Sequence, residues 1–338
     1  WKRHNHGDDY DTVILHVAQL IDEPLYRKSG EEIPQISLSY STEIEACYNQ
    51  WLQEKEEVAC SREIASIQPV VIRSYMSRLL TERLEEKTQV IAALLDRNKS
   101  NWEEAFYIIL CRNFGFGVNN EPFEMLARSL PLNCLAKHKD NLFQIEALLF
   151  GQSGLFDADT TDEYEKSLQK EYHFLRSKFS LVPLKNPGWK MLRIRPGNFP
   201  HIRIAQLAAL IHRSSKLFSK IIQYPDYDSI RSLLNTDVSG YWLTHYRFGK
   251  ESPERNKKLS KSTVDILMIN TIAPFLFYYG KQKSDADFQE KALALLERIA
   301  PEKNRIVRYW GQLGINPENA FESQALLQLR KNYCDVRK

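Results

Sequence analysis

Several features that mark particular protein classes are scarce or missing in this sequence. Only five of the 338 residues are cysteine, an odd number without short paired spacings, which does not indicate a disulfide framework. The net charge of +3 at pH 7 does not by itself indicate a nucleic-acid-binding protein. There is no uninterrupted apolar run of about 18 residues, so we expect no membrane association. Together these absences favour a soluble, cytoplasmic protein with reduced thiols.

Sequence signatures of common enzyme classes are missing as well. The sequence has no P-loop glycine-lysine motif, no Rossmann glycine fingerprint, no HExxH, no Cys-x-x-Cys pair and no Gly-x-Ser-x-Gly elbow. The stretch FGFGVNN has two glycines two residues apart, but it follows a helical pattern and is typical of a helix end. The residues alone therefore do not name a reaction.

The first 40 residues differ in pattern from the rest of the chain. TVILHV is an apolar, β-branched run of strand length, and EEIPQISLSY alternates apolar and polar residues. Because a turn signal at Ser29 and Gly30 lies between them, we expect two strands that form a hairpin with a long connection. Two strands alone are marginally stable in water, so we interpret residues 1–40 as the remnant of an N-terminal α/β module.

Residues 41–338 show helical patterns almost without interruption. Apolar residues recur at helical spacing from Gln68 to Asp96, and VDILMINTIAPFLFYYG predicts a core helix kinked at Pro274. No repeat of fixed length is visible, which favours a compact helical domain over a solenoid. The predicted fold class is α+β and predominantly α-helical. Capping-box patterns predict three further helix starts, at Ser100 with Glu103, Thr160 with Glu163, and Ser262 with Asp265.

The clearest local signal is a basic stretch between Pro183 and Arg231. It contains nine Lys or Arg residues and only two acidic residues, although the whole chain is nearly neutral. Aromatic residues are interleaved with these cations, which is the composition that binds phosphate backbones and stacks on bases. They include Trp189, Phe199, Phe218 and Tyr224.

A predicted helix beginning at Pro200 crosses this stretch. Arg203, Gln206 and Arg213 fall on a stripe about 80° wide, and the rest of the circumference is apolar. A helix of this kind is mainly buried, so Arg203 must meet an anion, a carboxylate or the wall of a cleft. The sequence thus predicts an anion-binding groove that binds DNA or RNA, with four arginines on one wall. The predicted binding residues are Arg193, Arg195, Asn198, Arg203, Gln206 and Arg213.

Two alternatives remain open for the same residues. The arginines can pair internally with acidic residues such as Glu121, Glu124 or Glu146, in which case the helical domain is a non-enzymatic scaffold or adaptor with an unknown protein partner. They can also line a closed pocket that binds a small anion or a nucleotide. Separately, His4 and His6 project to the same face of an extended segment and are candidate metal ligands, with Asp8 or Asp9 as a third ligand.

Several long stretches resemble the bacterial domain of unknown function (DUF) 2851 family. They are the W-x-x-H-x-H start with YDTVILHV, SNWEEAFYIILCRNFGFGVNNEPFEMLARSLP, AKHKDNLFQIEALLFGQSGL, WKMLRIRPGNFPHIRIAQLAALIHRSSKLFSK, SGYWLTHYRFGK, NTIAPFLFYYG and FESQALLQLRKNYC. The resemblance runs from residue 1 to about residue 334 and implies a bacterial protein, but it implies no particular activity.

The resemblance also raises expectations about the ends of the chain. It implies a further N-terminal portion similar in pattern to PD-(D/E)XK nucleases, which use Mg²⁺ or Mn²⁺ held by carboxylates, and a C-terminal cysteine-bearing tail. No residue of this sequence matches those acidic positions. We therefore expect a nuclease-like module whose metal carboxylates lie outside this chain, and we expect this chain alone to be inactive as an enzyme.

Overall fold

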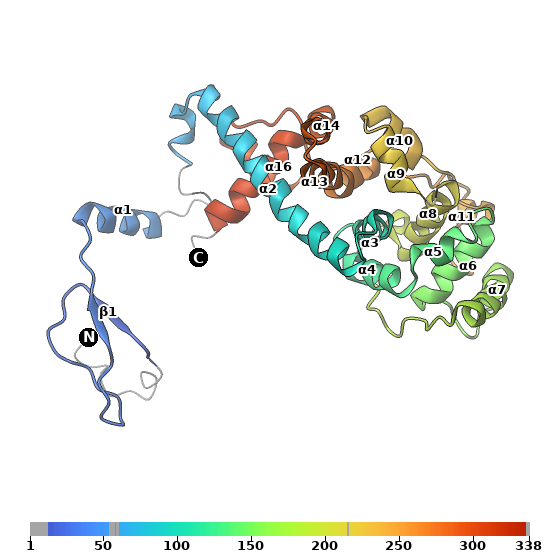
Figure 1. Ribbon diagram of the computed structural model, residues 1–338, viewed down its shortest axis with the longest axis horizontal. Helices are drawn as coiled ribbons and strands as arrows, with labels where there is room; N and C mark the ends of the chain where they lie inside the picture. The colour runs from blue at the N-terminus through green and yellow to red at the C-terminus, as the bar shows by residue number, and fades with distance from the viewer. Residues whose placement is uncertain (1–12, 54–57, 59–60, 215, 336–338) are drawn as a thin grey trace. The chain divides into compact units, whose positions relative to one another are not determined.

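The computed structural model describes residues 13–53, 58, 61–214 and 216–335. The chain divides into two units, Trp1–Ile64 and Ala65–Lys338. Its described residues are predominantly helical, as Figure 1 shows, which confirms the predicted helical character of the fold. The expected boundary at residue 40 precedes helix α1 (Thr42–Gln53), whereas this division places α1 in the first unit.

The first unit contains two short strands, β1 (His16–Ala18) and β2 (Gln35–Ser37), which pair in parallel. The predicted hairpin between them is therefore wrong. The turn at Gly30 instead closes a small loop inside the connection, where the Gly30 N–H donates to the carbonyl of Arg27 at 2.9 Å. An antiparallel bridge between Tyr26 and Glu32 completes that loop. A turn does form at Gly30, but it lies inside the connection and does not join β1 to β2 directly.

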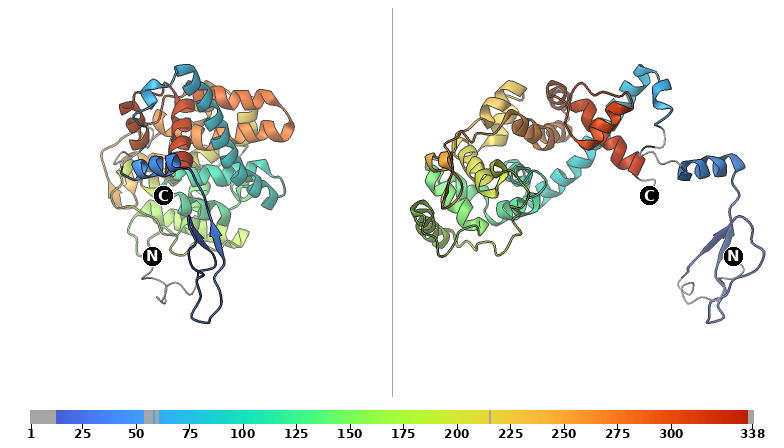
Figure 2. Two further views of the ribbon diagram at one scale, coloured as in Figure 1. Left: turned by 90° about the vertical axis from the view of Figure 1, so that its left-hand side faces the viewer. Right: turned by 180° about the vertical axis from the view of Figure 1, so that it is seen from behind.

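The second unit is built from helices and one small antiparallel hairpin that the sequence pattern did not predict. In both views α16 and α13 pack against the long helix α2 (Figures 1 and 2). The helices are α2 (Pro69–Arg97), α3 (Trp102–Phe114), α4 (Asn120–Ser129), α5 (Leu132–Ala136), α6 (Leu142–Ser153), α7 (Glu163–Phe179), α8 (Pro200–Arg213), α9 (Leu217–Gln223), α10 (Tyr227–Leu234), α11 (Gly240–Thr244), α12 (Lys261–Leu267), α13 (Ala273–Lys283), α14 (Ala286–Arg298), α15 (Arg305–Gln312) and α16 (Ala320–Leu329). The hairpin strands are β3 (His245–Arg247) and β4 (Lys250–Glu251), and short 3₁₀ or π segments are η2 (Ile64–Ser66), η3 (Pro196–Asn198), η4 (Met268–Ile272) and η5 (Arg330–Cys334).

The predicted capping boxes locate the helix starts but choose the wrong capping residues. The side chains of Asn101, Asp162 and Ser260 cap α3, α7 and α12 respectively, each one or two residues away from the predicted position. In each case a nearby Asn, Asp or Ser accepts a hydrogen bond from a first-turn N–H, which any of these residue types can do. The sequence pattern therefore gave the starts to within two residues.

The apolar segment around Pro274 forms a continuous helical run from α12 through η4 to α13. η4 is a π-helical turn that ends two residues before Pro274, which has no N–H to donate to the preceding turn. The carbonyl of Asn270 instead accepts a hydrogen bond from Asn113 Nδ2 at 3.0 Å. Among the described residues, the run 261–283 is long and apolar enough to cross a membrane, but 83% of its most apolar window is buried inside the protein. This burial is typical of a core helix.

Helix α8 lies in the centre of the second unit and positions the candidate site. Every residue from Pro200 to Ile211 is buried, and the helix packs against α6, α3 and β3. The sequence pattern predicted this burial because its apolar residues cover most of the helix circumference.

Candidate nucleic-acid interface

The predicted binding residues occupy three separate places. Arg193 and Arg195 lie in the connection before α8, Arg203 lies in the first half of α8, and Arg213 is its last residue. Ten residues of helix separate the last two by about 15 Å along the axis. The connection before α8 runs along the lower edge of the unit in Figure 1, whereas α9 and α10 lie at the upper edge. The arginines therefore do not form the single wall that the sequence pattern predicted.

Arg203 is buried and is held by neutral groups. Its Nη1 donates to Gln206 Oε1 at 2.9 Å, and its Nη2 donates to Asn198 Oδ1 at 2.5 Å. The guanidinium carbon lies 4.1 Å from the ring centre of Phe116. Burial lowers the pKa of Arg203 to about 10, so the side chain stays protonated at neutral pH. Three of the predicted residues, Asn198, Arg203 and Gln206, thus form one cluster.

The carboxylates proposed as internal partners are engaged elsewhere or exposed. Glu124 forms ion pairs with Arg112 and Arg128. Glu146 accepts a hydrogen bond from the hydroxyl of Tyr164. Glu121 is exposed. Arg203 therefore forms none of the internal ion pairs that the sequence left open as an alternative, and its Nη groups donate to amide oxygens instead.

The connection before α8 is fixed at two points but keeps its cations in solvent. The side chain of Asn119 exchanges two hydrogen bonds with the backbone of Lys190, at 3.0 and 2.8 Å. The indole N–H of Trp189 donates to the carbonyl of Ser153 at 2.9 Å. Arg193 and Arg195 are exposed, and neither forms an ion pair with a described residue.

Arg213 lines a basic pocket where the end of α8 meets α9 and α10. The pocket has a volume of about 360 Å³ and no acidic residue in its wall. Its lining residues are Arg213, Lys220, Gln223, Tyr224, Ser229, Ser232 and Leu233. Arg213 Nη1 donates to the carbonyl of Asn235 at 3.2 Å, and Tyr224 is 58% exposed. The nearby carboxylate of Glu103 accepts from the N–H groups of Phe218 and Ser219 at the start of α9.

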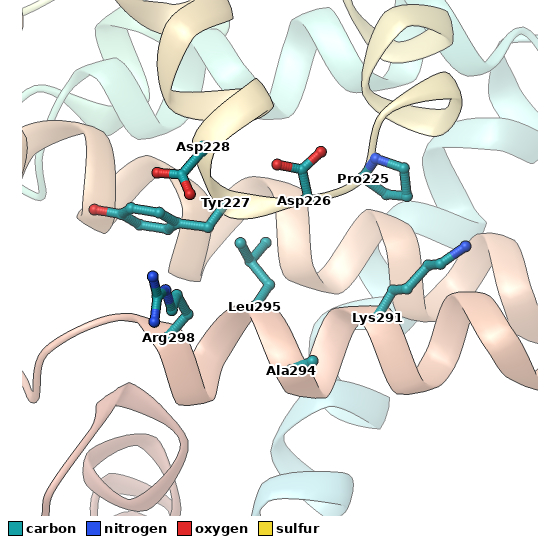
Figure 3. Close-up of a pocket in the computed structure, with 8 residues that line it drawn as sticks. All are labelled: Pro225, Asp226, Tyr227, Asp228, Lys291, Ala294, Leu295 and Arg298. Atoms are coloured by element: carbon teal, nitrogen blue, oxygen red, sulfur yellow. The ribbon is translucent and has the colours of Figure 1, made fainter.

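A second pocket lies on the other side of α10 and has a mixed charge. It has a volume of about 370 Å³ between the start of α10 and α14. Figure 3 shows Asp226 and Asp228 on one side, Lys291 and Arg298 on the other, and Leu295 between them. Lys291 forms an ion pair with Asp287 at 2.5 Å, and Asp226 accepts from the Ser229 N–H. This balance of charge distinguishes it from the basic pocket.

Of the aromatic residues expected to stack on bases, one belongs to the core and two are half-buried. Phe218 is buried and stacks on Trp102 with ring centres 5.3 Å apart. Trp189 packs edge-on against Phe123 and is held by the bond to Ser153 described above. Tyr224 remains as the exposed aromatic residue among the four, because Phe199 is half-buried at the start of α8.

The family described as "Protein of unknown function (DUF2851)" matches residues 1–305. The chain belongs to this family. No curated protein and no solved structure matches the chain. The predicted family membership is thereby confirmed.

The candidate metal ligands are not placed by the structure. His4 and His6, with Asp8 and Asp9, lie outside the described residues. Within the part of the chain that the structure describes, no group of three or more His, Cys, Asp or Glu side chains is arranged to hold a metal ion.

The structure shows two ionisable residues whose pKa values are strongly displaced. Glu146 on α6 is fully buried, and this burial raises its pKa to about 7. Lys87 on α2 donates to Asn270 Oδ1 at 3.1 Å and to Gln324 Oε1 at 3.2 Å, and burial together with Arg83 lowers its pKa to about 7. In the sequence Glu146 stands out as a carboxylate inside the apolar stretch LFQIEALLF, whereas Lys87 lies among other charged residues.

Proposed function

We propose that the helical unit of this protein binds nucleic acid at the basic pocket between α8, α9 and α10. The observation that carries this proposal is the composition of the pocket wall: Arg213 and Lys220 stand beside the exposed ring of Tyr224, without an acidic residue. Two cations next to an exposed aromatic ring favour a phosphate backbone with a neighbouring base stacked on the ring.

The surroundings of the pocket support the same proposal. Lys216 and Arg231 are exposed on the adjoining elements, and neither forms an ion pair with a described residue. The carboxylate of Glu103 at the start of α9 is already hydrogen-bonded to backbone N–H groups there. Unpaired exposed cations release counterions when phosphates bind, so they contribute more to affinity than cations in ion pairs.

Single-stranded nucleic acid fits the pocket better than a regular duplex. A base must be unstacked before it can lie on Tyr224, and single strands offer unstacked bases at little cost. The pocket is lined by residues of α8, α9 and α10, and α8 is buried along most of its length, so it is not available as a recognition helix for a major groove.

Cleavage of nucleic acid is a separate and weaker proposal. The family resemblance suggests a nuclease-like N-terminal module that uses Mg²⁺ or Mn²⁺, with its carboxylates outside this chain. The described residues hold no cluster of three metal-binding side chains. For this chain we therefore propose binding alone.

The proposal is tested by the salt dependence of binding to a fluorescent single-stranded oligonucleotide, measured by anisotropy. We expect wild-type affinity to fall steeply with salt, and the double variant Arg213→Ala, Lys220→Ala to lose about tenfold in affinity at about 50 mM salt. Each lost phosphate contact lowers the slope of log K against log salt concentration by about 0.7 for a single strand.

The matched control is the double variant Lys291→Ala, Arg298→Ala in the pocket of mixed charge (Figure 3). It removes the same formal charge, so a general electrostatic effect lowers affinity equally in both double variants. A loss of affinity in the Arg213→Ala, Lys220→Ala variant but not in the control supports binding at the basic pocket. Equal losses, or no binding by the wild type at low salt, contradict the proposal, and the latter favours the scaffold or adaptor.

A further inference from the structure

Arg203 is a buried cation that lacks a carboxylate partner among the described residues. The side chain is 6% exposed, and its two Nη atoms donate to the amide oxygens of Gln206 and Asn198. Its Nε is buried and has no hydrogen-bond acceptor within the described residues. A buried guanidinium is costly unless an anion balances its charge, and amide oxygens offset that cost only in part.

The amide oxygen of Gln206 is fixed, whereas that of Asn198 is replaceable. Gln206 is buried and also donates through Nε2 to the carbonyl of Lys257 at 2.7 Å. Asn198 is exposed at the end of η3, and a side chain at the preceding Gly197 would meet open space. An anion from solvent can therefore reach Nη2 of Arg203 by displacing the Asn198 side chain.

The same point lies beside the start of α8. This 14-residue helix begins at Pro200 without a capping side chain, so its first-turn N–H groups lack an intrahelical acceptor. Arg203 reaches back to Asn198, which precedes the helix, and so directs its positive charge to the positive end of the helix dipole. The backbone carbonyl of exposed Arg195 accepts a hydrogen bond from the Asn198 N–H at 2.8 Å, which fixes the turn that carries Asn198.

We propose that Arg203, Asn198 and the start of α8 form a binding site for a phosphate group, either free phosphate or the phosphomonoester of a small molecule. A tetrahedral oxyanion has enough oxygens to accept from the Arg203 fork and from helix N–H groups at once, which a planar carboxylate does less well. The site is separate from the basic pocket, from which about 15 Å of helix divides it.

The deciding variant is Asn198→Asp, which places a carboxylate where the Asn198 oxygen already accepts from Arg203. The change keeps the side-chain shape and supplies the missing counter-charge from within the protein. We expect the variant to unfold at a higher temperature than the wild type in buffer without phosphate. We also expect it to lose any stabilisation by added phosphate, because the new carboxylate occupies the same donors.

The experiment measures thermal unfolding of the full chain with millimolar inorganic phosphate against sodium chloride at equal ionic strength. It is done in the Arg213→Ala, Lys220→Ala background, so that phosphate bound in the basic pocket does not contribute. We expect phosphate to raise the unfolding temperature by about 2 °C or more in this background. Addition of Asn198→Asp, or of Arg203→Lys, which keeps the charge but loses the fork, is expected to abolish this rise.

A parallel measurement with adenosine monophosphate distinguishes the two sources of the phosphate group. A larger rise than with free phosphate identifies a phosphomonoester, and an equal or smaller rise identifies free phosphate. No phosphate effect in the background variant, or an equal effect after Asn198→Asp, overturns the proposal. Failure of nucleic-acid binding leaves this test unaffected, because the background already lacks the cations of the basic pocket.

Discussion

The two ends of α8 carry arginines on the same helical stripe in opposite surroundings. Arg203 is buried in the first half, where two amides and the ring of Phe116 hold its guanidinium. Arg213 is exposed at the last residue, where it lines a basic pocket with Lys220 and Tyr224. One helix therefore presents a desolvated cation at one end and a solvated cation at the other.

This difference separates two kinds of anion recognition. A solvated cation contributes to binding mainly by releasing counterions, which suits a polymer with many phosphates. A desolvated cation interacts more strongly with one anion because the local dielectric is low, but only a small ligand can reach it. The comparison between the two ends can be tested through stability, pH dependence and binding.

The largest expected effect is on stability, from removal of Arg203. Arg203→Ala removes the donors to Asn198 and Gln206 and leaves a cavity beside Phe116, so we expect the free energy of unfolding to fall by about 3 kcal/mol. Arg213→Ala is expected to change it by no more than about 0.5 kcal/mol because the side chain is exposed. Urea unfolding of both variants provides the measurement. Equal stability of the two variants would contradict the inference that Arg203 is buried in the fold while Arg213 is solvated.

The second largest expected effect is on the pH dependence of stability, through the buried carboxyl group of Glu146. Glu146, on the helix packed against α8, has its pKa raised to about 7 from an unfolded value of 4.5. The unfolded chain thus releases this proton at lower pH than the folded chain, so the contribution is present below pH 4.5 and is lost as pH rises through 7. We expect the wild type to lose roughly 2 kcal/mol between pH 5 and pH 8 relative to Glu146→Gln.

The pH prediction is checked by urea unfolding of the wild type and Glu146→Gln at both pH values. Arg213→Ala serves as the comparison from the exposed end, and it should follow the wild-type profile. A constant difference between the wild type and Glu146→Gln across this range would show that Glu146 does not titrate in the folded protein near neutral pH.

The smallest expected effect is on the affinity for single strands, from removal of the Tyr224 ring at the exposed end of α8. Tyr224→Ala removes the ring from the basic pocket, and we expect it to weaken single-strand binding by about 1 kcal/mol. Tyr224→Phe keeps the stacking face and should bind as the wild type does. Anisotropy titration at one salt concentration separates the two, and equal losses in both variants would assign the effect to the hydroxyl instead of the ring.

The sequence predicted the helices better than it predicted the strands. The range of α2 and the burial of α8 followed from apolar spacing, which is a local property of the chain. The pairing of β1 with β2 depends on residues almost twenty positions apart, and the turn at Gly30 was compatible with more than one pairing. The capping residues were missed by one or two positions because several neighbouring side chains are able to cap.

The candidate site was predicted only in part, because local spacing does not specify contacts between distant segments. A helical projection places Arg203, Gln206 and Arg213 on one stripe, and the hydrogen bond between Arg203 and Gln206 agrees with it. The projection does not show how deeply each side chain is buried. It therefore could not show that Arg203 is buried and Arg213 exposed, nor that Phe218 belongs to the core while Tyr224 stays exposed.

By itself the sequence determined family membership, the helical character of the chain, the burial of α8 and the concentration of cations between residues 183 and 231. Only the tertiary structure decided which of those cations are solvated. Phe116 and the connection that ends at Asn198 cover the first half of α8, whereas the end of the helix opens into a pocket. The physical reason is that burial of a side chain depends on which distant segments pack over it, and local spacing does not specify those segments.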